Sequence, residues 1–311
     1  MRFGIMAMQL DELIPSGLSS QAALAHVAGF DHAALVRRLA SSGFNLIELG
    51  GDLGLFFPQA FTPRAVEKLV ALKQELHLGY TVHLPLWSVE PSTPLAPVRQ
   101  GSVRAVIEAI HATRPLQPEV YVLHATGALA AEFYRMRLPE IARALILRQF
   151  QNNARESIQA ILFEADLPSR RLAIETIEFP LDLTVELIEQ LDLSTCLDTG
   201  HVLVGFSGPM DVFTALERCL PRLAEIHLHD GPWQGPERRI GYGKDHQPLG
   251  AGDLDVPRLL DRLTAVNFNG PIIFELRVEQ ALASLDVIRA IRPAAISNNF
   301  IPPCFPTATL S

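Results

Sequence analysis

Residues 172–175 read LAIE, residues 196–201 read CLDTGH, residues 225–230 read EIHLHD and residues 272–275 read IIFE. Each stretch is a short apolar run that ends in, or just before, a side chain able to bind a metal ion. Three earlier runs (LIEL, YTVH and YVLH) share this property, and only the first run, Phe3 to Ile5, lacks it. Repetition at the same place in each run indicates one site assembled from many strand ends. The side chains concerned are Glu48, His83, His124, Glu175, Asp198, His201, His227 and Glu275.

Segments with the 3.6-residue periodicity of an amphipathic helix separate these runs. Strand and helix alternate about eight times, which is typical of parallel strands joined by crossover helices. Eight such units in 311 residues favour an α/β fold of the (β/α)8 TIM-barrel type over an open doubly wound sheet. The expected helices span residues 31–42, 63–76, 98–113, 138–165, 181–190, 212–219, 256–265 and 279–291.

The barrel is expected to form a single domain over residues 1–292, followed by an irregular Pro-rich tail at 293–311. The connection at 7–30 contains Pro and Gly and is expected to be an extended loop over the barrel mouth. A second long connection at 231–252 is also rich in Gly and Pro. It carries three basic residues that are expected either to hold a substrate phosphate or to be solvated: Arg238, Arg239 and Lys244.

Local signals support this partition. Asp31 is expected to cap the start of one helix, and Gly79 follows a helix that must stop before the next strand. Four histidines lie in loop or helical segments and are expected to face solvent without a functional role: His26, His32, His77 and His111.

Bulk composition narrows the class of protein. A net charge of -8 and a pI near 5.7 argue against a nucleic-acid or anionic-membrane surface, since both need clustered Lys and Arg. Cys196, Cys219 and Cys304 are far apart and form no CxxC pair, which argues against a disulfide framework or a thiolate zinc site. We therefore expect a cytoplasmic protein with a small-molecule substrate and with no nucleic-acid or membrane partner.

The strand-end side chains are expected to meet at one metal centre, because catalytic groups of such barrels lie at the C-terminal ends of the strands. A set of carboxylates and imidazoles suits zinc, manganese, iron or cobalt better than magnesium or calcium. Glu175, Asp198, His227 and Glu275 are the main expected ligands, and His201, three residues after Asp198, is expected to reach the same centre.

Other polar residues keep more than one interpretation. His83 and His124 are expected either to bind metal directly or to hydrogen-bond the substrate. Glu48 is expected either to act at a distance on metal or substrate, or to form an ion pair. His229 shares a strand face with His227, and we expect His229 and Asp230 to support the ligands, with His229 also within reach of a substrate.

Over residues 3–291 these features resemble the xylose isomerase-like TIM barrels, the AP endonuclease family 2 superfamily, which includes endonuclease IV and many sugar isomerases and epimerases. The resemblance rests on LDTGH at 197–201, on the strand-end Glu175 and Glu275, and on HQPLGAGDLD starting at His246. It implies that the Glu, Asp, His, Glu quartet of the superfamily falls on Glu175, Asp198, His227 and Glu275.

The resemblance leaves two classes of enzyme open. Sugar isomerases and epimerases use one divalent metal, with the two glutamates of the quartet placed to move protons next to a carbonyl. Endonuclease IV-like phosphodiesterases use additional ligands. The matching positions here are His83, His124, His201, Asp245 and His246. This surplus favours two or three divalent ions, zinc or manganese before iron or cobalt, and attack on phosphorus.

A closer likeness is to the cobamide-remodelling phosphodiesterases of this superfamily. Endonuclease IV itself places its Asp two residues before the His, whereas Asp245 directly precedes His246 here. The likeness to the cobamide enzymes implies hydrolysis of the phosphoester that joins the lower-ligand nucleoside to the corrinoid, leaving cobinamide phosphate. The similar segments are YTVHLP at 80–85, SVRAVIEAI at 102–110, YVLH at 121–124, CLDTGHVLVG at 196–205 and KDH at 244–246.

The expected protein is therefore a metal-dependent phosphodiester hydrolase in which Glu175, Glu275 and His201 are catalytic. A sugar or sugar-phosphate isomerase or epimerase with one metal is the alternative. A third interpretation is a corrinoid- or sugar-binding protein that has kept the barrel without the reaction.

Overall fold

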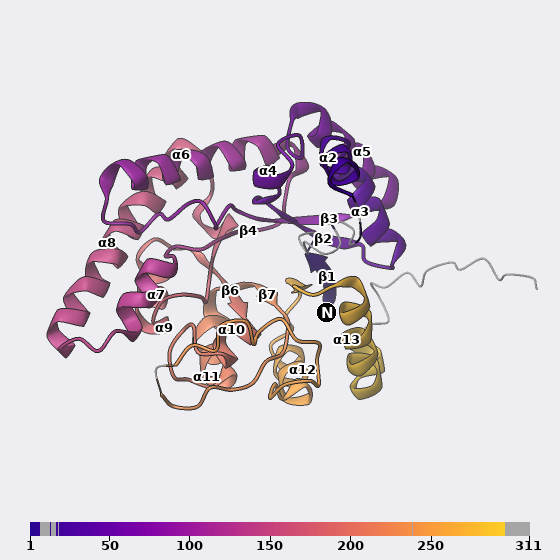
Figure 1. Cartoon of the computed structure of the whole chain (residues 1–311). Helices are drawn as coiled ribbons and strands as arrows, with labels where there is room; N and C mark the ends of the chain where they lie inside the picture. Colours follow the sequence, from indigo (N-terminus) through magenta and orange to yellow (C-terminus); the bar gives the residue numbers. More distant parts are fainter. Residues whose placement is uncertain (7–12, 14–16, 18, 238, 296–311) are drawn as a thin grey trace, which may run out of the picture.

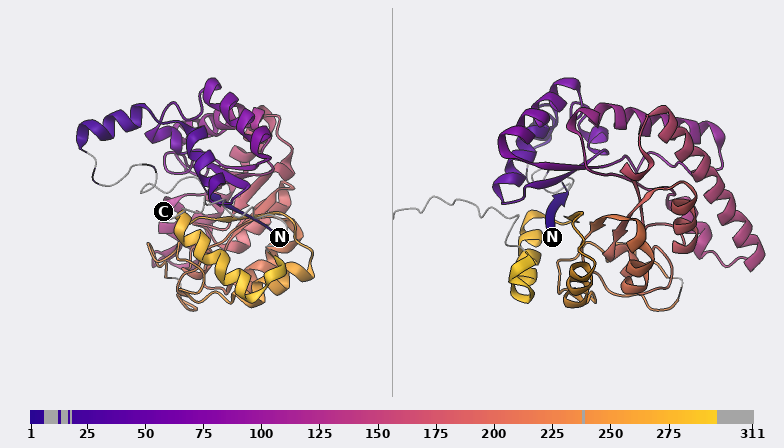
Figure 2. Two further views of the ribbon diagram at one scale, coloured as in Figure 1. Left: turned by 90° about the vertical axis from the view of Figure 1, so that its right-hand side faces the viewer. Right: turned by 180° about the vertical axis from the view of Figure 1, so that it is seen from behind.

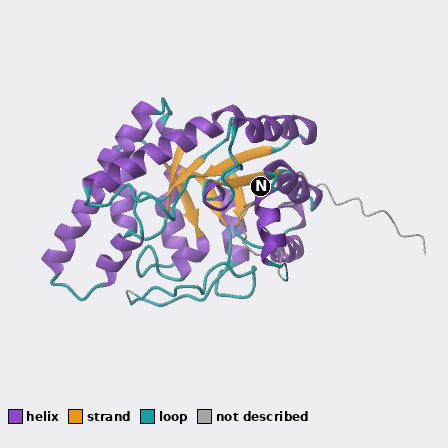
Figure 3. Cartoon of the chain, turned by 45° about the horizontal axis from the view of Figure 1, so that its top comes forward, coloured by secondary structure: helices purple, strands orange, loops and turns teal. Residues whose placement is uncertain are grey.

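Eight parallel strands close into a barrel in the order β1 to β8, as the computed structural model shows (Figures 1 and 3). The structure describes residues 1–6, 13, 17, 19–237 and 239–295. The single-domain (β/α)8 barrel expected from the sequence is confirmed. The strands are β1 (Arg2–Met6), β2 (Leu46–Gly50), β3 (Gly79–His83), β4 (Tyr121–Leu123), β5 (Leu172–Glu175), β6 (Ser194–Asp198), β7 (Leu223–His227) and β8 (Pro271–Phe274).

Helices surround the barrel on all sides (Figures 1 and 2). Eight of them correspond to the predicted helical segments, and each begins and ends within two residues of the prediction. These eight are α3 (His32–Ser41), α5 (Pro63–Leu76), α6 (Ala96–Thr113), α8 (Glu140–Glu164), α9 (Leu181–Gln190), α11 (Val212–Cys219), α12 (Val256–Ala265) and α13 (Val278–Ile291).

The apolar stripe of each outer helix explains why it lies against the strands. In α12 the buried residues are Val256, Leu259, Leu260 and Leu263, which recur at the spacing that places them on one helix face. Burial of each such side chain contributes about 1.5–3 kcal/mol. Asp255 caps this helix by accepting a hydrogen bond from the backbone N–H of Arg258.

Helix ends agree with the sequence signals at one position and differ at another. Asp31 caps α3 as predicted, because its side chain accepts hydrogen bonds from the backbone N–H groups of Ala33 and Ala34. Gly79 follows α5 before the next strand, as predicted, but it is not the capping residue of that helix. His77 ends α5 in the left-handed region at φ 53°, and Gly79 is already the first residue of β3.

Four helices lie outside the predicted helical segments: α2 (Ser20–Ala28), α4 (Leu53–Phe56), α7 (Ala128–Arg135) and α10 (Thr199–Leu203). Helix α2 corrects the expectation of an irregular segment at 7–30, although residues 7–12, 14–16 and 18 lie outside the described part of the chain. Of the tail, Pro293–Ala295 forms a 3-10 turn and residues 296–311 lie outside the described part. Within the described residues, no helix is both long and apolar enough to cross a membrane.

His32 is buried, which corrects the expectation that it faces solvent. Its Nδ1–H donates to the backbone oxygen of Ala60 at 3.1 Å, and the ring packs edge-on against Phe61. Burial lowers the pKa of His32 to about 4, because the protonated ring would lose its hydration. Of the other three histidines, His26 is partly buried, whereas His77 and His111 are exposed as expected.

The buried His32 predicts a loss of stability in acid. Its pKa is lower in the folded state than in the unfolded chain, so its contribution is fully present above pH 6.5 and is lost as the pH falls toward 4. The loss amounts to about 3 kcal/mol. The free energy of unfolding should be measured with denaturant at several pH values. It should fall between pH 6.5 and pH 4 in the native chain and fall less steeply in His32→Gln. Equal slopes in the two proteins would contradict the assignment.

Candidate metal centre

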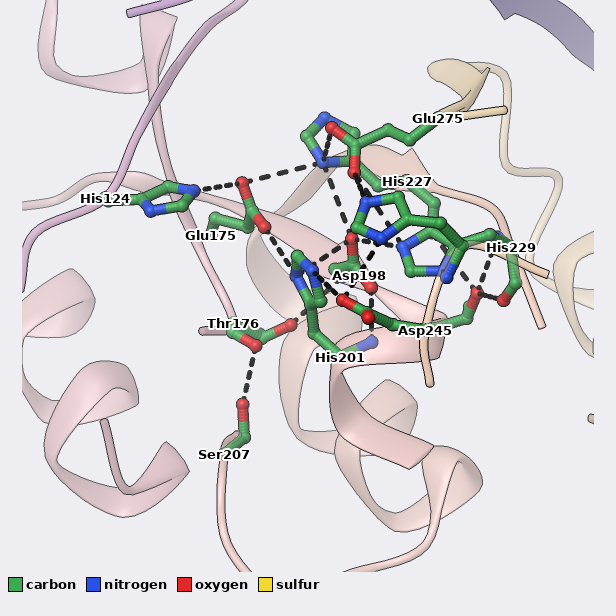
Figure 4. Close-up of polar contacts among 12 residues, drawn as sticks. His124, Glu175, Thr176, Asp198, His201, Ser207, His227, His229, Asp245 and Glu275 are labelled. Atoms are coloured by element: carbon green, nitrogen blue, oxygen red, sulfur yellow. Dashed lines mark hydrogen bonds and ion pairs between the residues drawn. The ribbon is translucent and has the colours of Figure 1, made fainter. Parts of the chain in front are cut away.

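Glu175, the last residue of β5, is the hub of a buried cluster at the C-terminal ends of the strands. Its Oε2 lies 3.1 Å from Nε2 of His83 and 3.0 Å from Nε2 of His124, and its Oε1 lies 2.9 Å from Nδ1 of His201. Figure 4 shows the carboxylate between His124 and His201. Burial raises the pKa of Glu175, but attraction to His124 and His227 outweighs burial and holds that pKa well below its usual range.

The DTGH turn positions two further side chains. Asp198 ends β6 and caps the short helix α10, since its Oδ1 accepts a 2.6 Å hydrogen bond from the backbone N–H of His201. A Cβ atom at Gly200 would lie 2.0 Å from Nδ1 of His229, so only glycine fits there. Thr199 ties the turn to β7 by donating its hydroxyl hydrogen to the backbone oxygen of His229 at 2.7 Å.

His227 and Glu275, from β7 and β8, complete the inner part of the cluster. Nδ1 of His227 lies 3.3 Å from Oε1 of Glu275, 3.5 Å from Oε2 of Glu175 and 3.8 Å from Oδ2 of Asp198. The quartet predicted from the strand ends is therefore brought together in space. Nδ1 of His227 makes no hydrogen bond, although it is buried and three carboxylates surround it.

Asp245 and His246, from the loop after β7, form the outer part. Oδ2 of Asp245 lies 3.2 Å from Nε2 of His201 and 3.1 Å from Nδ1 of His246, while Nε2 of His246 lies 3.3 Å from Oε2 of Glu275. His246 adopts φ 55°, in the left-handed region, and this conformation brings the side chains of two consecutive residues to the same cluster. Burial lowers the pKa of His246, but hydrogen bonds with Asp245 and Glu275 outweigh burial and raise it to about 9.

The donor set fits divalent metal ions. Nδ1 of His83 lies 2.9 Å from the backbone oxygen of Leu84, which can only accept, so this nitrogen carries the hydrogen. In the neutral ring, Nε2 then presents a lone pair to the ionised carboxylate of Glu175, and a cation between them would remove the repulsion. At the mouth of the barrel there are three groups of residues, and within each group the donor atoms lie within 4.8 Å of one another. The groups are His83, His124 and Glu175; Glu175, Asp198 and His227; and His201, His229, His246 and Glu275.

His229 lies within the third donor group, but hydrogen bonds already engage both of its ring nitrogens, so it supports a ligand. Its Nδ1 accepts a 2.9 Å hydrogen bond from the backbone N–H of His246, so Nε2 carries the hydrogen and donates it to Oδ2 of Asp198 at 2.9 Å. The ring is fully buried. The expected substrate contact is therefore corrected, whereas the expected support of a ligand agrees with this geometry.

The remaining residues that were expected to contact substrate do not all lie in one place in the fold. Glu48 is fully buried inside the barrel, away from the open mouth, which corrects the expectation of a substrate contact. Arg239 is exposed and forms a 2.6 Å ion pair with Glu237. Arg239 and Lys244 both line a hollow next to the cluster, and Arg238 lies outside the described residues.

A cavity of about 490 Å³ opens onto the cluster, and part of its wall comes from residues that the sequence did not indicate. Trp87, Phe206 and Glu178 line it beside the metal-binding side chains. Glu178 has a strained φ of 59°, and its Oε2 lies 3.8 Å from Nδ1 of His124. Its position three residues after Glu175 gave no signal in the sequence, because only its left-handed backbone conformation directs the side chain to the cavity.

Asp230 holds the loop after β7 in place. Its Oδ1 accepts hydrogen bonds from the backbone N–H groups of Gly231 and Leu254, and its Oδ2 accepts from those of Gly250 and Gly252, all at 2.8–3.0 Å. One buried carboxylate thus joins both ends of the segment that carries Asp245 and His246.

Asp230→Asn should loosen this loop, because the new amide group would face two backbone N–H donors. We expect a loss of about 1–3 kcal/mol in the free energy of unfolding. Amide hydrogen exchange should also become faster over residues 231–254 and stay unchanged in α9. Asp253→Asn is the matched control, since Asp253 accepts a single exposed hydrogen bond, from the backbone N–H of Trp233. Equal effects of the two variants would contradict this role.

These features define a (β/α)8 barrel with a buried cluster of carboxylates and imidazoles at the C-terminal ends of its strands. The xylose isomerase-like TIM barrel family matches residues 36–292, and the chain belongs to this family. The expected superfamily is thereby confirmed.

Several known proteins are similar to this chain at low sequence identity. An uncharacterized protein of Methanocaldococcus jannaschii is 20% identical over 238 residues, which cover 73% of this chain and 75% of the relative. A D-tagatose 3-epimerase-like protein superimposes with a TM-score of 0.67 at 17% identity, over 96% of this chain and 99% of that chain. Endonuclease IV from Thermus thermophilus superimposes with a TM-score of 0.63 at 19% identity, over 94% of this chain and 98% of that chain. These structural likenesses establish the shared fold.

Proposed function

We propose that this protein is a metal-dependent phosphodiester hydrolase that uses two or three divalent ions, zinc or manganese first. The observation that carries the proposal is the number of donors around one cavity. The quartet of Glu175, Asp198, His227 and Glu275 would suffice for a single ion. Five further side chains extend the cluster on both sides: His83, His124, His201, Asp245 and His246.

The donors of the mouth fall into three groups, two of which share Glu175. Glu175 belongs to two groups and would bridge the ion held by His83 and His124 to the ion held by Asp198 and His227. His201, Asp245 and His246 would hold the outer ion. Bound ions would stabilise the negative charge that develops on the phosphoryl group during attack by water.

The chain's own residues would orient this centre. Glu178 lies beside His124 and lines the cavity, where it would keep the imidazole turned toward Glu175. His229 fixes Asp198, and Asp230 fixes the loop that carries Asp245. Trp87 and Phe206 would cover the cavity and exclude bulk water from the reacting phosphoester.

A hollow of about 700 Å³ beside the centre supports an anionic substrate. It lies between α7 and the loop after β7, and its lining includes Arg135, Lys244 and Tyr242. The ring of Tyr242 contacts Phe206 edge-on at 5.3 Å, and Phe206 contacts His201 in the same way, so the hollow adjoins the cluster. A substrate with its phosphoester at the centre would reach this hollow with a second charged or aromatic part.

The first substrate to test is a cobamide, on the strength of the resemblance in the five sequence segments quoted above. Cleavage would separate the lower-ligand nucleoside from cobinamide phosphate. The free thiols of Cys196 and Cys219 support a cytoplasmic setting for such a reaction.

A divalent-metal sugar isomerase or epimerase is the second candidate. The quartet alone favours it, and the shared fold with a D-tagatose 3-epimerase-like protein adds support. Glu175 and Glu275 both lie close to Nδ1 of His227 and would move protons at a carbon next to a carbonyl. In this reaction the five additional donor side chains would have no role.

The two candidates predict different products. Metal-stripped protein reloaded with zinc, manganese or cobalt would be incubated with adenosylcobalamin and, separately, with ketoses, followed by chromatography of the products. Release of the nucleoside and cobinamide phosphate supports the hydrolase. An untouched corrinoid together with interconverted ketoses would overturn the proposal in favour of the epimerase.

Glu175→Gln should abolish hydrolysis, with a loss in kcat of at least about 100-fold, because a bridging carboxylate loses its charge. The variant should also bind fewer metal ions. Glu186→Gln is the control, since Glu186 lies on the outer helix α9 in an exposed ion pair with Arg148. Unchanged turnover in Glu175→Gln would exclude this site as the catalytic centre.

Lys244→Ala should raise KM for an anionic substrate about 10-fold, consistent with loss of one charged hydrogen bond, while kcat changes little. The effect should shrink as salt is added. Lys68→Ala is the control, because Lys68 pairs with Asp31 on an outer helix. An unchanged KM in Lys244→Ala would show that the hollow does not hold the charged part of the substrate.

A further inference from the structure

A second polar compartment lies inside the barrel, one layer of side chains below the mouth. Glu48, Thr81 and Glu225 each occupy a position two residues before the end of their strand. Side chains two residues apart on a strand share a face, so Thr81 lies below His83 and Glu225 lies below His227. All three are buried at 0% exposure, and neither Glu48 nor Glu225 lines the cavity of the mouth.

This compartment holds most of the unsatisfied polar atoms of the structure. Among the described residues, seven buried side-chain nitrogen and oxygen atoms make no hydrogen bond. Five of the seven belong to Glu48, Glu225 and His227. Four of these lie in the compartment: Oε2 of Glu48, both carboxylate oxygens of Glu225 and Nε2 of His227. The fifth, Nδ1 of His227, faces the mouth. Buried polar atoms without partners are rare in folded proteins and point to an ion or water that the protein holds.

The charge of the compartment points to a cation. Two carboxylates lie out of contact with solvent, and a neutral hydroxyl, that of Thr81, donates to Oε1 of Glu48 at 3.3 Å. The guanidinium of Arg2 is already engaged by both carboxylate oxygens of Glu119, at 2.7 and 2.6 Å. Burying a carboxylate without a compensating charge costs several kcal/mol.

We propose that Glu48, Glu225 and His227 bind a divalent cation inside the barrel, separate from the ions of the mouth. Donor atoms of the three residues lie within 4.8 Å of one another, close enough for one ion to contact all of them. Nε2 of His227 lies 3.2 Å from Oε2 of Glu48 on this side, while Nδ1 faces the mouth. Carboxylate oxygens with an imidazole nitrogen suit zinc or manganese, and the hydroxyl of Thr81 supplies a further oxygen.

The interior site and the mouth share one residue, His227. A neutral imidazole offers one lone pair, so ions at Nε2 and Nδ1 together require the ring to give up its remaining hydrogen to solvent and to bridge the two sites as an imidazolate. Loading of the interior site is therefore expected to alter the metal affinity of the mouth. This site does not depend on which reaction the mouth catalyses.

Metal counting tests the proposal. Full-length protein would be stripped with a chelator, reloaded with Zn²⁺ and freed of excess, and zinc per chain would be measured by elemental analysis. Glu225→Gln, which keeps the size of the side chain, should bind one zinc fewer than the native chain. Glu119→Gln is the control, because Glu119 is a carboxylate of the same barrel that lies outside the donor group and should leave the count unchanged.

A second variant and a melting measurement keep the test decisive. Glu48→Gln should lose the same zinc and replaces Glu225→Gln if that variant fails to fold, with circular dichroism as the check. Removal of zinc should lower Tm more in the native chain than in either variant. A full zinc count in Glu225→Gln or in Glu48→Gln would overturn the interior site and leave the hydrolase proposal untouched. Absence of corrinoid cleavage would overturn the hydrolase proposal and leave the interior site untouched.

Discussion

The charge of one carboxylate, that of Glu175, is the constraint on which the centre depends. A buried carboxylate stays ionised only where positive or polar groups replace the water that it has lost. The barrel supplies them by bringing the imidazoles of His124, directly after β4, and His201, in helix α10, to within 3.0 Å of its two oxygens. A closed ring of parallel strands makes this possible, because residues far apart in sequence end at the same rim.

The sequence was a good guide wherever one regular period decides the structure. Strand runs and helix stripes repeat with fixed spacing, so the barrel and its eight main helices could be predicted to within two residues. The same logic brought the quartet together. It failed for Glu48, because the end of an apolar run does not reveal which layer of the barrel a side chain occupies. Glu48 belongs to the layer below the rim, whereas Gly50 ends the strand.

Other errors have separate causes. His32 lies on the buried face of α3 with Leu35, Val36 and Leu39, so the helix period did contain the signal for its burial. His229 differs, because its role depends on a backbone N–H from His246 that only the folded loop provides. The position of the Glu178 side chain depends on a left-handed backbone conformation, which cannot be predicted from the residue type. Loop geometry of this kind is settled by tertiary contacts and not by local sequence.

Asp230 has a consequence for how this protein can change over evolutionary time. The shape of the loop after β7 is held through backbone N–H groups, which every residue type except proline offers, and Gly252 provides the space that the contact needs. Surface side chains between those anchors can therefore be exchanged without loss of the loop's path. The loop also forms one wall of the hollow beside the centre. Substrate preference can thus diverge there by single substitutions while the metal-binding side chains stay in place.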